Sequence, residues 1–287
     1  MPQPVYRRRP GAGAGCLSRG GGRLLIAAAI ALIAIISFYS SRSQNPVTGK
    51  MQHVDLTPDQ EIALGLQSAP EMAQQFGGLA ADPQAQEAVD TIGRRLVSSG
   101  PAADSPYRFE FHLLADPKTV NAFALPGGQV FITVGLLDRL ETEGQLAGVL
   151  AHEIGHVIER HGAEHLAKQR LTTGLVGAVG VAASDPDRPS SGAQAAAIAA
   201  AIGQLINMRY GRDDELESDG WGVRLAAAAG YDPRSMIRVM EILAEASQGQ
   251  APPEFFSTHP NPENRIARIE AAIAEVFPSG VPDGLEP

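Results

Sequence analysis

Residues 152 to 156 read His-Glu-Ile-Gly-His, and their types and spacing are typical of a metal site. Two histidines four positions apart on a helix project from one face about one turn apart, so both imidazoles can reach one metal ion. Glu153 lies beside the metal rather than on it, where a carboxylate can take a proton from water that the metal activates. The pentapeptide therefore predicts one zinc ion per chain, bound by His152 and His156, and a hydrolytic reaction with Glu153 as its base.

This geometry requires a helix, and the surrounding sequence predicts one. Apolar residues recur there at three- and four-residue steps, namely Leu146, Val149, Leu150, Ile154 and Val157. The alternative is a pair of ordinary core histidines, but buried histidines rarely bring an adjacent glutamate in this order. The pattern favours the metal site.

Two histidines leave the zinc coordination incomplete, because catalytic sites usually have three protein ligands and one water. On a continuous helix, His161 and His165 are rotated by about 140° and 180° from His156, so we expect both to face away from the metal. A longer pattern with a further glycine and histidine is excluded, because Glu159 and Gly162 occupy those two positions.

A better candidate for the third ligand lies in the acidic run at residues 212–219, which opens another predicted helix. Glu215 and Asp219 share one face of that helix, whereas Glu217 points elsewhere. Glu215 can bind the metal while Asp219 accepts the other ring N–H of a ligand histidine. Taken alone, the run indicates a solvated helix start stabilised by the helix dipole. The histidine pair makes the metal-site interpretation the better one.

The elements around the metal site are mainly helical. Residues 121–125 and 129–134 flank the turn sequence Pro126-Gly127-Gly128 and predict a β-hairpin just before the zinc helix. Residues 107–114 alternate apolar and polar side chains like a half-buried strand. Helices are predicted from the capping sequence Thr57-Pro58 onward and at residues 83–97, 233–246 and 262–277. The fold class is therefore α+β, mainly helical, with a small β-sheet or hairpin beside the active-site helix.

The hairpin has two interpretations. A sheet edge beside a zinc helix can bind an extended peptide as an added strand, and a purely structural hairpin fits the sequence equally well. Residues 171–207 form two apolar pieces, separated by the break at residues 185–189. Their length favours buried helices or a lid over the site rather than a membrane segment.

Charge divides the chain into two parts. All 32 acidic residues lie beyond residue 50, where they outnumber the 16 basic ones, while the first 50 residues carry only basic charges. An acidic body argues against nucleic acid as a partner, because phosphate contacts need clustered Lys and Arg. The 287 residues with 44% hydrophobic content are enough for a packed core.

The basic N-terminal part contains a predicted membrane-targeting segment. Residues 24–39 are uncharged and mostly apolar, and five arginines precede them. At 1.5 Å per residue they span roughly 24 Å, less than the ~30 Å hydrocarbon core of a bilayer unless flanking residues contribute. The only small-x-small triplet nearby, Ser41-Arg42-Ser43, is a poor cleavage site. We favour an uncleaved anchor with the catalytic domain outside the cytoplasm, on the periplasmic side, over secretion to the periplasm after signal cleavage.

The predicted organisation follows from these features. The chain comprises a basic N-terminal segment (1–23), a transmembrane anchor or signal sequence (24–40), a linker (41–56), a zinc metallopeptidase domain (57–278) and a C-terminal tail (279–287).

Several motifs occur together in this chain, namely Asn45-Pro-Val-Thr-Gly, Asn121-Ala-Phe-Ala-Leu-Pro-Gly-Gly, the zinc helix with Arg160-His161, Glu215-Leu-Glu-Ser-Asp219, Ser257-Thr-His-Pro260 and Arg265-Ile266. With these motifs the sequence resembles the HtpX-type and CAAX prenyl protease-type zinc metallopeptidases, a branch of the gluzincins, over roughly residues 45–275. Ser218 replaces the alanine usual in the family's Glu-x-x-Ala-Asp motif. The resemblance implies a zincin-like fold, Glu215 as the third zinc ligand and a position near the metal for His259.

His259 then has two functional interpretations besides that of an ordinary loop histidine. It can donate to the oxyanion that forms at the scissile carbonyl, or it can bind zinc in a resting state and block water. Arg212 and Tyr210 are further candidate donors near the site, with helix-terminal packing as their alternative.

The expected function is that of a zinc endopeptidase. Glu153 would take the proton from water during attack on a peptide carbonyl and pass it to the leaving amine. We expect unfolded or extended polypeptides as substrates, in envelope quality control or in processing of one dedicated protein, and a latent resting form fits the family. The alternative is a non-catalytic, chaperone-like envelope protein stabilised by zinc. Glu153 disfavours it, because a closed structural site has no use for this side chain.

Overall fold

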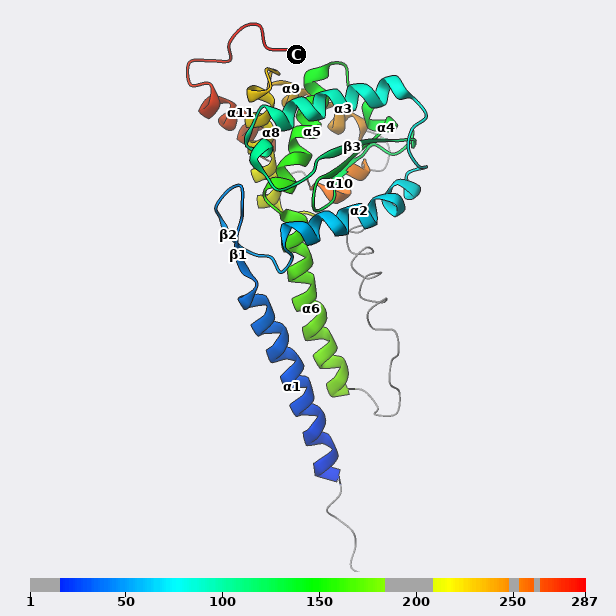
Figure 1. Cartoon of the computed structure of the whole chain (residues 1–287), viewed down its shortest axis with the longest axis vertical. Coiled ribbons are helices and arrows are strands. Elements are labelled where there is room, and N and C mark those ends of the chain that lie inside the picture. The colour runs from blue at the N-terminus through cyan, green and yellow to red at the C-terminus, as the bar shows by residue number, and fades with distance from the viewer. Residues whose placement is uncertain (1–15, 184–208, 248–252, 261–263) are drawn as a thin grey trace, which may run out of the picture. The chain divides into compact units, whose positions relative to one another are not determined.

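The computed structural model describes four ranges of the chain: residues 16–183, 209–247, 253–260 and 264–287 (Figure 1). Three of the five arginines that precede the predicted membrane segment lie outside these ranges. The whole second apolar piece of residues 171–207, which follows the break at residues 185–189, also lies outside them. The chain divides into two compact units. The first comprises residues 1–40 and 168–191, and the second comprises residues 41–167 and 192–287.

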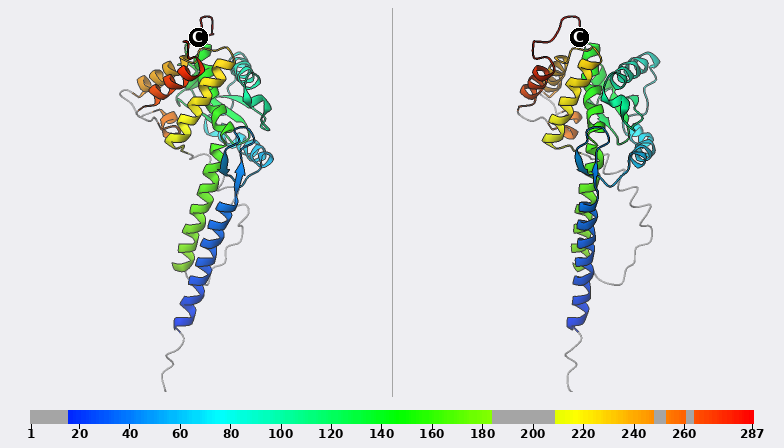
Figure 2. Two further views of the ribbon diagram at one scale, coloured as in Figure 1. Left: turned by 90° about the vertical axis from the view of Figure 1, so that its left-hand side faces the viewer. Right: turned by 60° about the vertical axis from the view of Figure 1, so that its left-hand side comes forward.

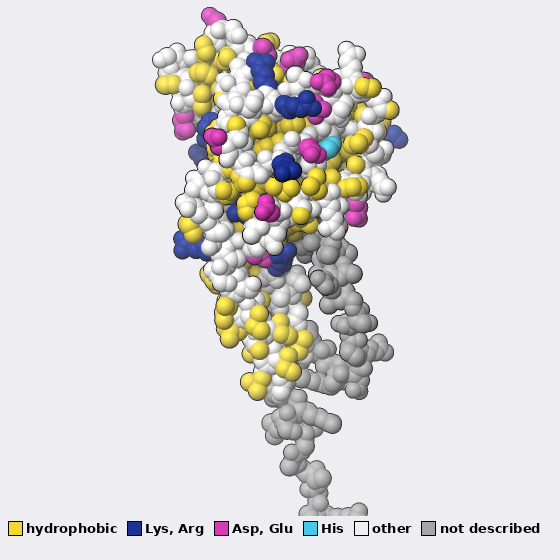
Figure 3. All heavy atoms as spheres, in the orientation of Figure 1, with side chains coloured by type: hydrophobic (Ala, Val, Ile, Leu, Met, Phe, Trp, Pro, Cys, Tyr) yellow, Lys and Arg dark blue, Asp and Glu magenta, His cyan; other side chains and the backbone are white. Residues whose placement is uncertain are grey.

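The first unit contains α1 (Cys16–Ser40) and the part of α6 (His161–Ala183) that follows residue 167. Helix α1 includes the predicted apolar run, and large apolar side chains gather on the surface of this unit, among them Leu25 of α1 and Val179 of α6 (Figure 3). The two helices approach closely where both residues are small, because a Cβ atom on Gly174 would lie 2.7 Å from that of Ala34. Among the described residues, no helix combines the length and hydrophobicity needed to cross a bilayer.

The second unit has the predicted mainly helical α+β composition. Its helices are α2 (Pro58–Gln75), α3 (Pro83–Ser98), α4 (Val134–Leu137), α5 (Glu143–Ile158), the start of α6, α8 (Arg212–Ala228), α9 (Ser235–Ala246), α10 (Glu254–Thr258), α11 (Arg265–Val276) and a 3-10 turn at Pro101–Asp104. Its strands are β1 (Arg42–Gln44), β2 (Met51–His53), β3 (Glu110–Leu114), β4 (Ala122–Ala124) and β5 (Gln129–Thr133). On the face shown in Figure 3, Lys and Arg side chains are interspersed with Asp and Glu.

The main sheet has the strand order β3-β5-β4. β4 and β5 form the predicted antiparallel hairpin, and β3 pairs with β5 in parallel, with Leu113 opposite Ile132. The hairpin turn depends on glycine: Gly127 has a φ of 87°, and a Cβ atom there would lie 2.4 Å from Cα of Ile62 on α2. Because β4 is the last strand in the order β3-β5-β4, it is an edge strand, and it packs against α5.

Helix α5, which carries the pentapeptide, is the central element of this unit. In both views of Figure 2 it runs between α8, α9 and α11 on one side and the sheet with α2 and α3 on the other. Thr142 caps its first turn by accepting a hydrogen bond from the backbone N–H of Gln145. All residues from Gly144 to Ile158 are buried, so the pentapeptide lies in the interior of the fold.

The chain changes direction directly after α5. Arg160 has a φ of 59°, in the left-handed region that non-glycine residues rarely adopt, and α6 begins at the next residue. Its buried guanidinium binds the Glu61 carboxylate of α2 and the carbonyl oxygen of Leu56. The assumption of one continuous helix through His161 and His165 is therefore wrong.

Residues expected to form a linker include an antiparallel hairpin of β1 and β2, which pairs Ser43 with Gln52. Thr57, directly after this segment, caps α2 as predicted. Its side chain accepts from the backbone N–H of Gln60, whose own side chain accepts from the backbone N–H of Thr57.

Candidate metal centre

Four buried side chains converge between α5, α8 and the segment after α10. One nitrogen or oxygen atom from each of His152, His156, Glu215 and His259 lies within 4.8 Å of the other three. The Nε2 atoms of His152 and His156 are 3.1 Å apart, and each lies 3.5 Å from an oxygen of Glu215. Nδ1 of His259 is 3.0 Å from Oε1 of Glu215. The fold thus brings the two predicted histidines and the predicted carboxylate together.

Close packing of α5 against α8 places Glu215 beside the histidines. Gly155, inside the pentapeptide, makes this approach possible, because a Cβ atom there would lie 2.9 Å from Cβ of Trp221 and 3.1 Å from Cα of Ser218. A larger residue at this position would push α8 away from α5. Glycine at the fourth position of the pentapeptide therefore helps to set the distance between the donor groups.

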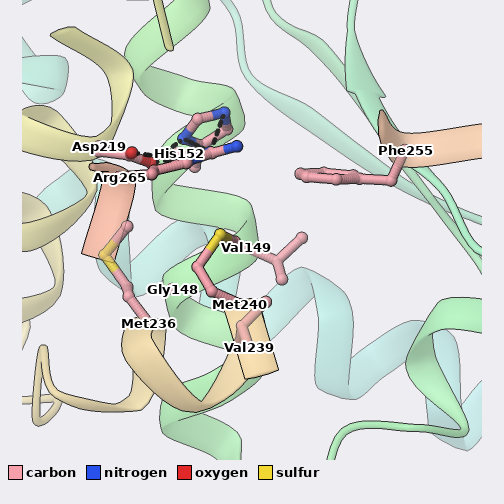
Figure 4. Close-up of a pocket in the computed structure, with 9 residues that line it drawn as sticks. All are labelled: Gly148, Val149, His152, Asp219, Met236, Val239, Met240, Phe255 and Arg265. Carbon is pink, nitrogen blue, oxygen red and sulfur yellow. Dashed lines mark hydrogen bonds and ion pairs between the residues drawn. The ribbon is translucent and has the colours of Figure 1, made fainter. Parts of the chain in front are cut away.

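Asp219 and Arg265 form the outer layer behind His152 (Figure 4). Nδ1 of His152 donates to Oδ1 of Asp219 at 2.9 Å, which leaves Nε2 free to face the donor cluster. The Arg265 side chain, 1% exposed, donates to Asp219 through Nε at 2.7 Å and Nη2 at 2.9 Å, and its Nη1 lies 3.1 Å from Glu215. Burial alone would raise the pKa of Asp219, but Arg265 and the His152 hydrogen bond hold it below its usual value.

Arg265 is a site residue that analysis of the sequence did not assign. Arginine on an amphipathic helix usually lies in solvent, so neither its type nor the period of α11 indicates a buried position. Only the family resemblance included it, without a role. The structure places it between the two carboxylates that orient the site.

Glu153 faces the cluster without a fixed partner. It is fully buried, and neither of its carboxylate oxygens makes a hydrogen bond within the described structure. Nε2 of His259 lies 3.6 Å from its Oε1. Burial raises the pKa of Glu153 above its usual value, because desolvation disfavours the charged form.

The donor set fits a divalent zinc ion. Both carboxylate oxygens of Glu153 and Nε2 of His259 are buried and lack hydrogen bonds among the described residues, and such atoms are costly unless something binds them. Imidazole nitrogens with one carboxylate oxygen are typical zinc ligands. Glu153, Glu215 and Asp219 form a group of three buried carboxylates with the buried cation of Arg265 beside them, and a divalent cation would add positive charge to this group.

His156 is enclosed by aromatic rings. Tyr210 stacks on it with ring centroids 3.9 Å apart, and Tyr210 is buried, which raises its pKa well above the usual value. Nδ1 of His161 lies 3.0 Å from Nδ1 of His156. The turn at Arg160 brings His161 against the outer side of His156, which the assumption of one continuous helix did not predict. His161 is outside the group of four donors, in agreement with the expectation that it is not a metal ligand.

The other predicted residues lie further out. Arg212 is exposed at the first position of α8, and within the described parts of the chain its side chain makes no hydrogen bond or ion pair with the cluster. His165 donates to Asp214 at 2.7 Å instead of facing the donors. Glu217 points away from the cluster, as expected, toward His161 and Lys50.

A model of peptidase family M48 matches residues 83–273, which include the whole donor set. The chain belongs to peptidase family M48. It is 34% identical over 194 residues to the beta-barrel assembly-enhancing protease of Escherichia coli (strain K12), which covers 65% of this chain and 38% of that protein. It is 32% identical over 228 residues to the protein of the same name from Yersinia pestis, covering 77% and 46%. It is 30% identical over 244 residues to the mitochondrial metalloendopeptidase OMA1 of Schizosaccharomyces pombe, covering 84% and 69%.

M48 membership agrees with the geometry: the chain contains an M48 zinc metalloendopeptidase domain with a site for one Zn²⁺ at His152, His156, Glu215 and His259. The mainly helical α+β fold with its small sheet beside α5 is confirmed. The chain spans less than half the length of the bacterial relatives.

Proposed function

We propose that this chain is an endopeptidase of the cell envelope that hydrolyses extended polypeptides with a zinc-dependent site. The observation that carries the proposal is the state of Glu153. A fully buried carboxylate without a hydrogen bond, next to four zinc-type donors, has no structural role but is placed for proton transfer.

In the proposed reaction, His152, His156 and Glu215 would hold the zinc ion, which would supply Lewis-acid chemistry at the site. Glu153 accepts the proton of the attacking water and later delivers it to the leaving amine. Asp219 fixes His152 in the tautomer whose Nε2 faces the donor cluster. Arg265 keeps Asp219 ionised for this task.

For His259 we propose the resting-state role, in which its imidazole would be a fourth ligand of the zinc ion and would take the place of water. Its Nδ1 lies 3.0 Å from Glu215 and 3.4 Å from Nε2 of His152, close enough to share one ion with them. In this role, His259→Ala raises peptidase activity. A strong loss of kcat in His259→Ala would instead support the alternative role as an oxyanion donor. Tyr210, stacked on His156, is a nearby candidate donor for that role.

For substrate binding we propose that an extended peptide adds to the outer edge of β4. This strand lies at the end of the sheet and packs against the zinc helix, so a peptide along it would pass close to Glu153. Main-chain pairing of this kind accepts many sequences, which suits substrates that are unfolded.

The test compares the wild-type chain with Glu153→Gln on a casein-like substrate. We expect the variant to bind one zinc ion per chain, because the glutamine keeps the shape of the side chain, and to lose cleavage by at least about 100-fold because it cannot accept a proton. Equal turnover in the two proteins would contradict the assignment. If the wild-type chain and His259→Ala both fail to cleave the substrate but still bind unfolded chains, the result would favour the chaperone-like alternative.

We further propose that the N-terminal segment anchors the chain to a membrane and that the peptidase domain lies on the periplasmic side. The proposal is supported by the charge-free run of residues 24–39 and by the exposed apolar side chains of α1, such as Leu25 and Ile33. The names of the bacterial relatives, which refer to β-barrel assembly, support a role in envelope protein quality control. Carbonate extraction of membranes, with a chain lacking residues 1–40 as the control, tests the anchor.

A further inference from the structure

The side of His156 that faces away from the donor cluster contacts a second histidine. If Nε2 of His156 binds the metal, Nδ1 carries the proton, and it donates to Nδ1 of His161 at 3.0 Å. The proton of His161 must then be on Nε2, which lies 3.3 Å from Oε2 of Glu217. The three side chains therefore have one consistent direction of donation, from His156 through His161 to the carboxylate of Glu217.

The Glu217 carboxylate, the last acceptor in this series of hydrogen bonds, is in turn bound by Lys50. Nζ of Lys50 donates to Oε1 of Glu217 at 2.8 Å and to Oε1 of Glu159 at 3.1 Å. The same oxygen of Glu159 accepts from Nε1 of Trp221 at 2.6 Å. His161 is 2% exposed, whereas the side chains of Lys50 and Glu217 are about half exposed, so the connected groups extend from the metal centre to the surface.

Lys50 directly precedes β2, and the β1–β2 hairpin is attached to the zinc helix by other contacts. Asn45, which is 1% exposed, donates through Nδ2 to the carbonyl oxygen of Ile158 at 2.8 Å. Nε2 of Gln52 donates to the carbonyl oxygen of Glu159. These bonds satisfy carbonyl groups at the C-terminal end of α5, which has no further turn of helix to bind them. The hairpin is thus fixed at the helix end from which the histidine relay starts.

We infer that His161, Glu217 and Lys50 are positioning residues that orient His156 through a hydrogen-bonded relay anchored in the β1–β2 hairpin. The inference rests on the proposed zinc ligation by His156. A hydrogen bond to the outer ring nitrogen fixes the tautomer and orientation of a ligand histidine and strengthens its bond to the metal. His152 receives this support directly from Asp219, whereas His156 receives it from a carboxylate one imidazole further away.

The main test measures the zinc dissociation constant of the full chain by competition with a chromophoric chelator. Glu217→Gln keeps the size of the side chain but removes the charge, and we expect it to weaken zinc binding by roughly 10-fold. Glu270→Gln is the matched control, because Glu270 is an exposed carboxylate on α11 that contacts none of these residues. If the Glu217→Gln constant lies within about threefold of the control, the inference is wrong.

A second pair of variants separates positioning from simple packing. His161→Asn keeps an acceptor near the place of Nδ1, and His161→Leu keeps volume without any acceptor. We expect zinc affinity to fall in the order wild type, Asn, Leu, with the free energy of unfolding of the zinc-free protein as the check on folding. Equal zinc affinities for Asn and Leu would mean that His161 only fills space, and would overturn the relay.

These measurements are independent of the proteolytic proposal. Zinc affinity is measured without any substrate. A chain that binds one zinc ion but cleaves nothing, both as wild type and as His259→Ala, would therefore refute the endopeptidase and leave the relay open to the same comparison. A wild-type chain that cleaves normally, with unchanged zinc affinity in Glu217→Gln, would refute the relay alone.

Discussion

Replacement of Arg265 by methionine removes the one guanidinium from the group of three buried carboxylates. Asp219 loses two hydrogen bonds, of 2.7 and 2.9 Å, and Glu215 loses a cation at 3.1 Å. Removing one partner of a buried ion pair typically costs about 3–5 kcal/mol, because the remaining charge stays buried without compensation. We expect a loss of this size in the free energy of unfolding of the zinc-free protein, and a smaller loss when zinc supplies positive charge to Glu215.

The assay is urea unfolding in chelator and in saturating zinc, followed by the fluorescence of Trp221. This residue is the only tryptophan of the chain and lies on α8, between Glu215 and the hairpin contacts. Arg268→Met is the matched control, since Arg268 is an exposed cation one turn further along α11 and should cost no more than about 0.5 kcal/mol.

The loss of unfolding free energy in Arg265→Lys should lie between those of Arg265→Met and Arg268→Met, because lysine keeps the charge but cannot make the forked contact with Asp219. A cost below about 1 kcal/mol for Arg265→Met without zinc would refute the charge argument. An equal cost with and without zinc would show that the metal does not share the carboxylates with Arg265.

Two further predictions concern the scaffold. Gly127→Ala should lower the free energy of unfolding by about 1–3 kcal/mol, and by more than the control Gly280→Ala. Both glycines have positive φ, but only Gly127 has backbone atoms within 3 Å of the added methyl group. Equal losses for the two variants in urea unfolding would argue against this contact. Glu61→Ala should lower the free energy of unfolding by about 3–5 kcal/mol, because it leaves Arg160 charged and buried. The control Asp90→Ala removes a surface ion pair and should lower it by less than about 1 kcal/mol. Equal changes in melting temperature for the two variants, measured by calorimetry, would contradict the prediction.

Local patterns account for what the sequence predicts well. The capping box at Thr57, the hairpin around Gly127 and the zinc helix each depend on residues within a few positions of one another, and all three are present. Glu215 and Asp219 could be paired with the zinc helix because their spacing puts both on one helix face. Such features need no knowledge of the tertiary fold.

The missed features depend on partners far away in the sequence. Arg160 adopts its left-handed conformation where Glu61, 99 residues earlier, holds its guanidinium, and no local signal marks such a position. The strands β1 and β2 have three residues each, which is too short for an alternating pattern. The burial of Arg265 and the approach of His161 to His156 both arise from packing between separate helices.

The turn at Arg160 limits how this metal centre can be transplanted by protein design. A straight helix that carries only the pentapeptide would place the residue five positions after His156 about 140° around the axis, out of reach of its ring. A graft that keeps the contact between His156 and His161 must therefore include the turn, the start of α6 and a carboxylate equivalent to Glu61 from another helix. The smallest unit that can be grafted is therefore the zinc helix, the turn at Arg160 and the start of α6, together with the carboxylate that binds the Arg160 guanidinium.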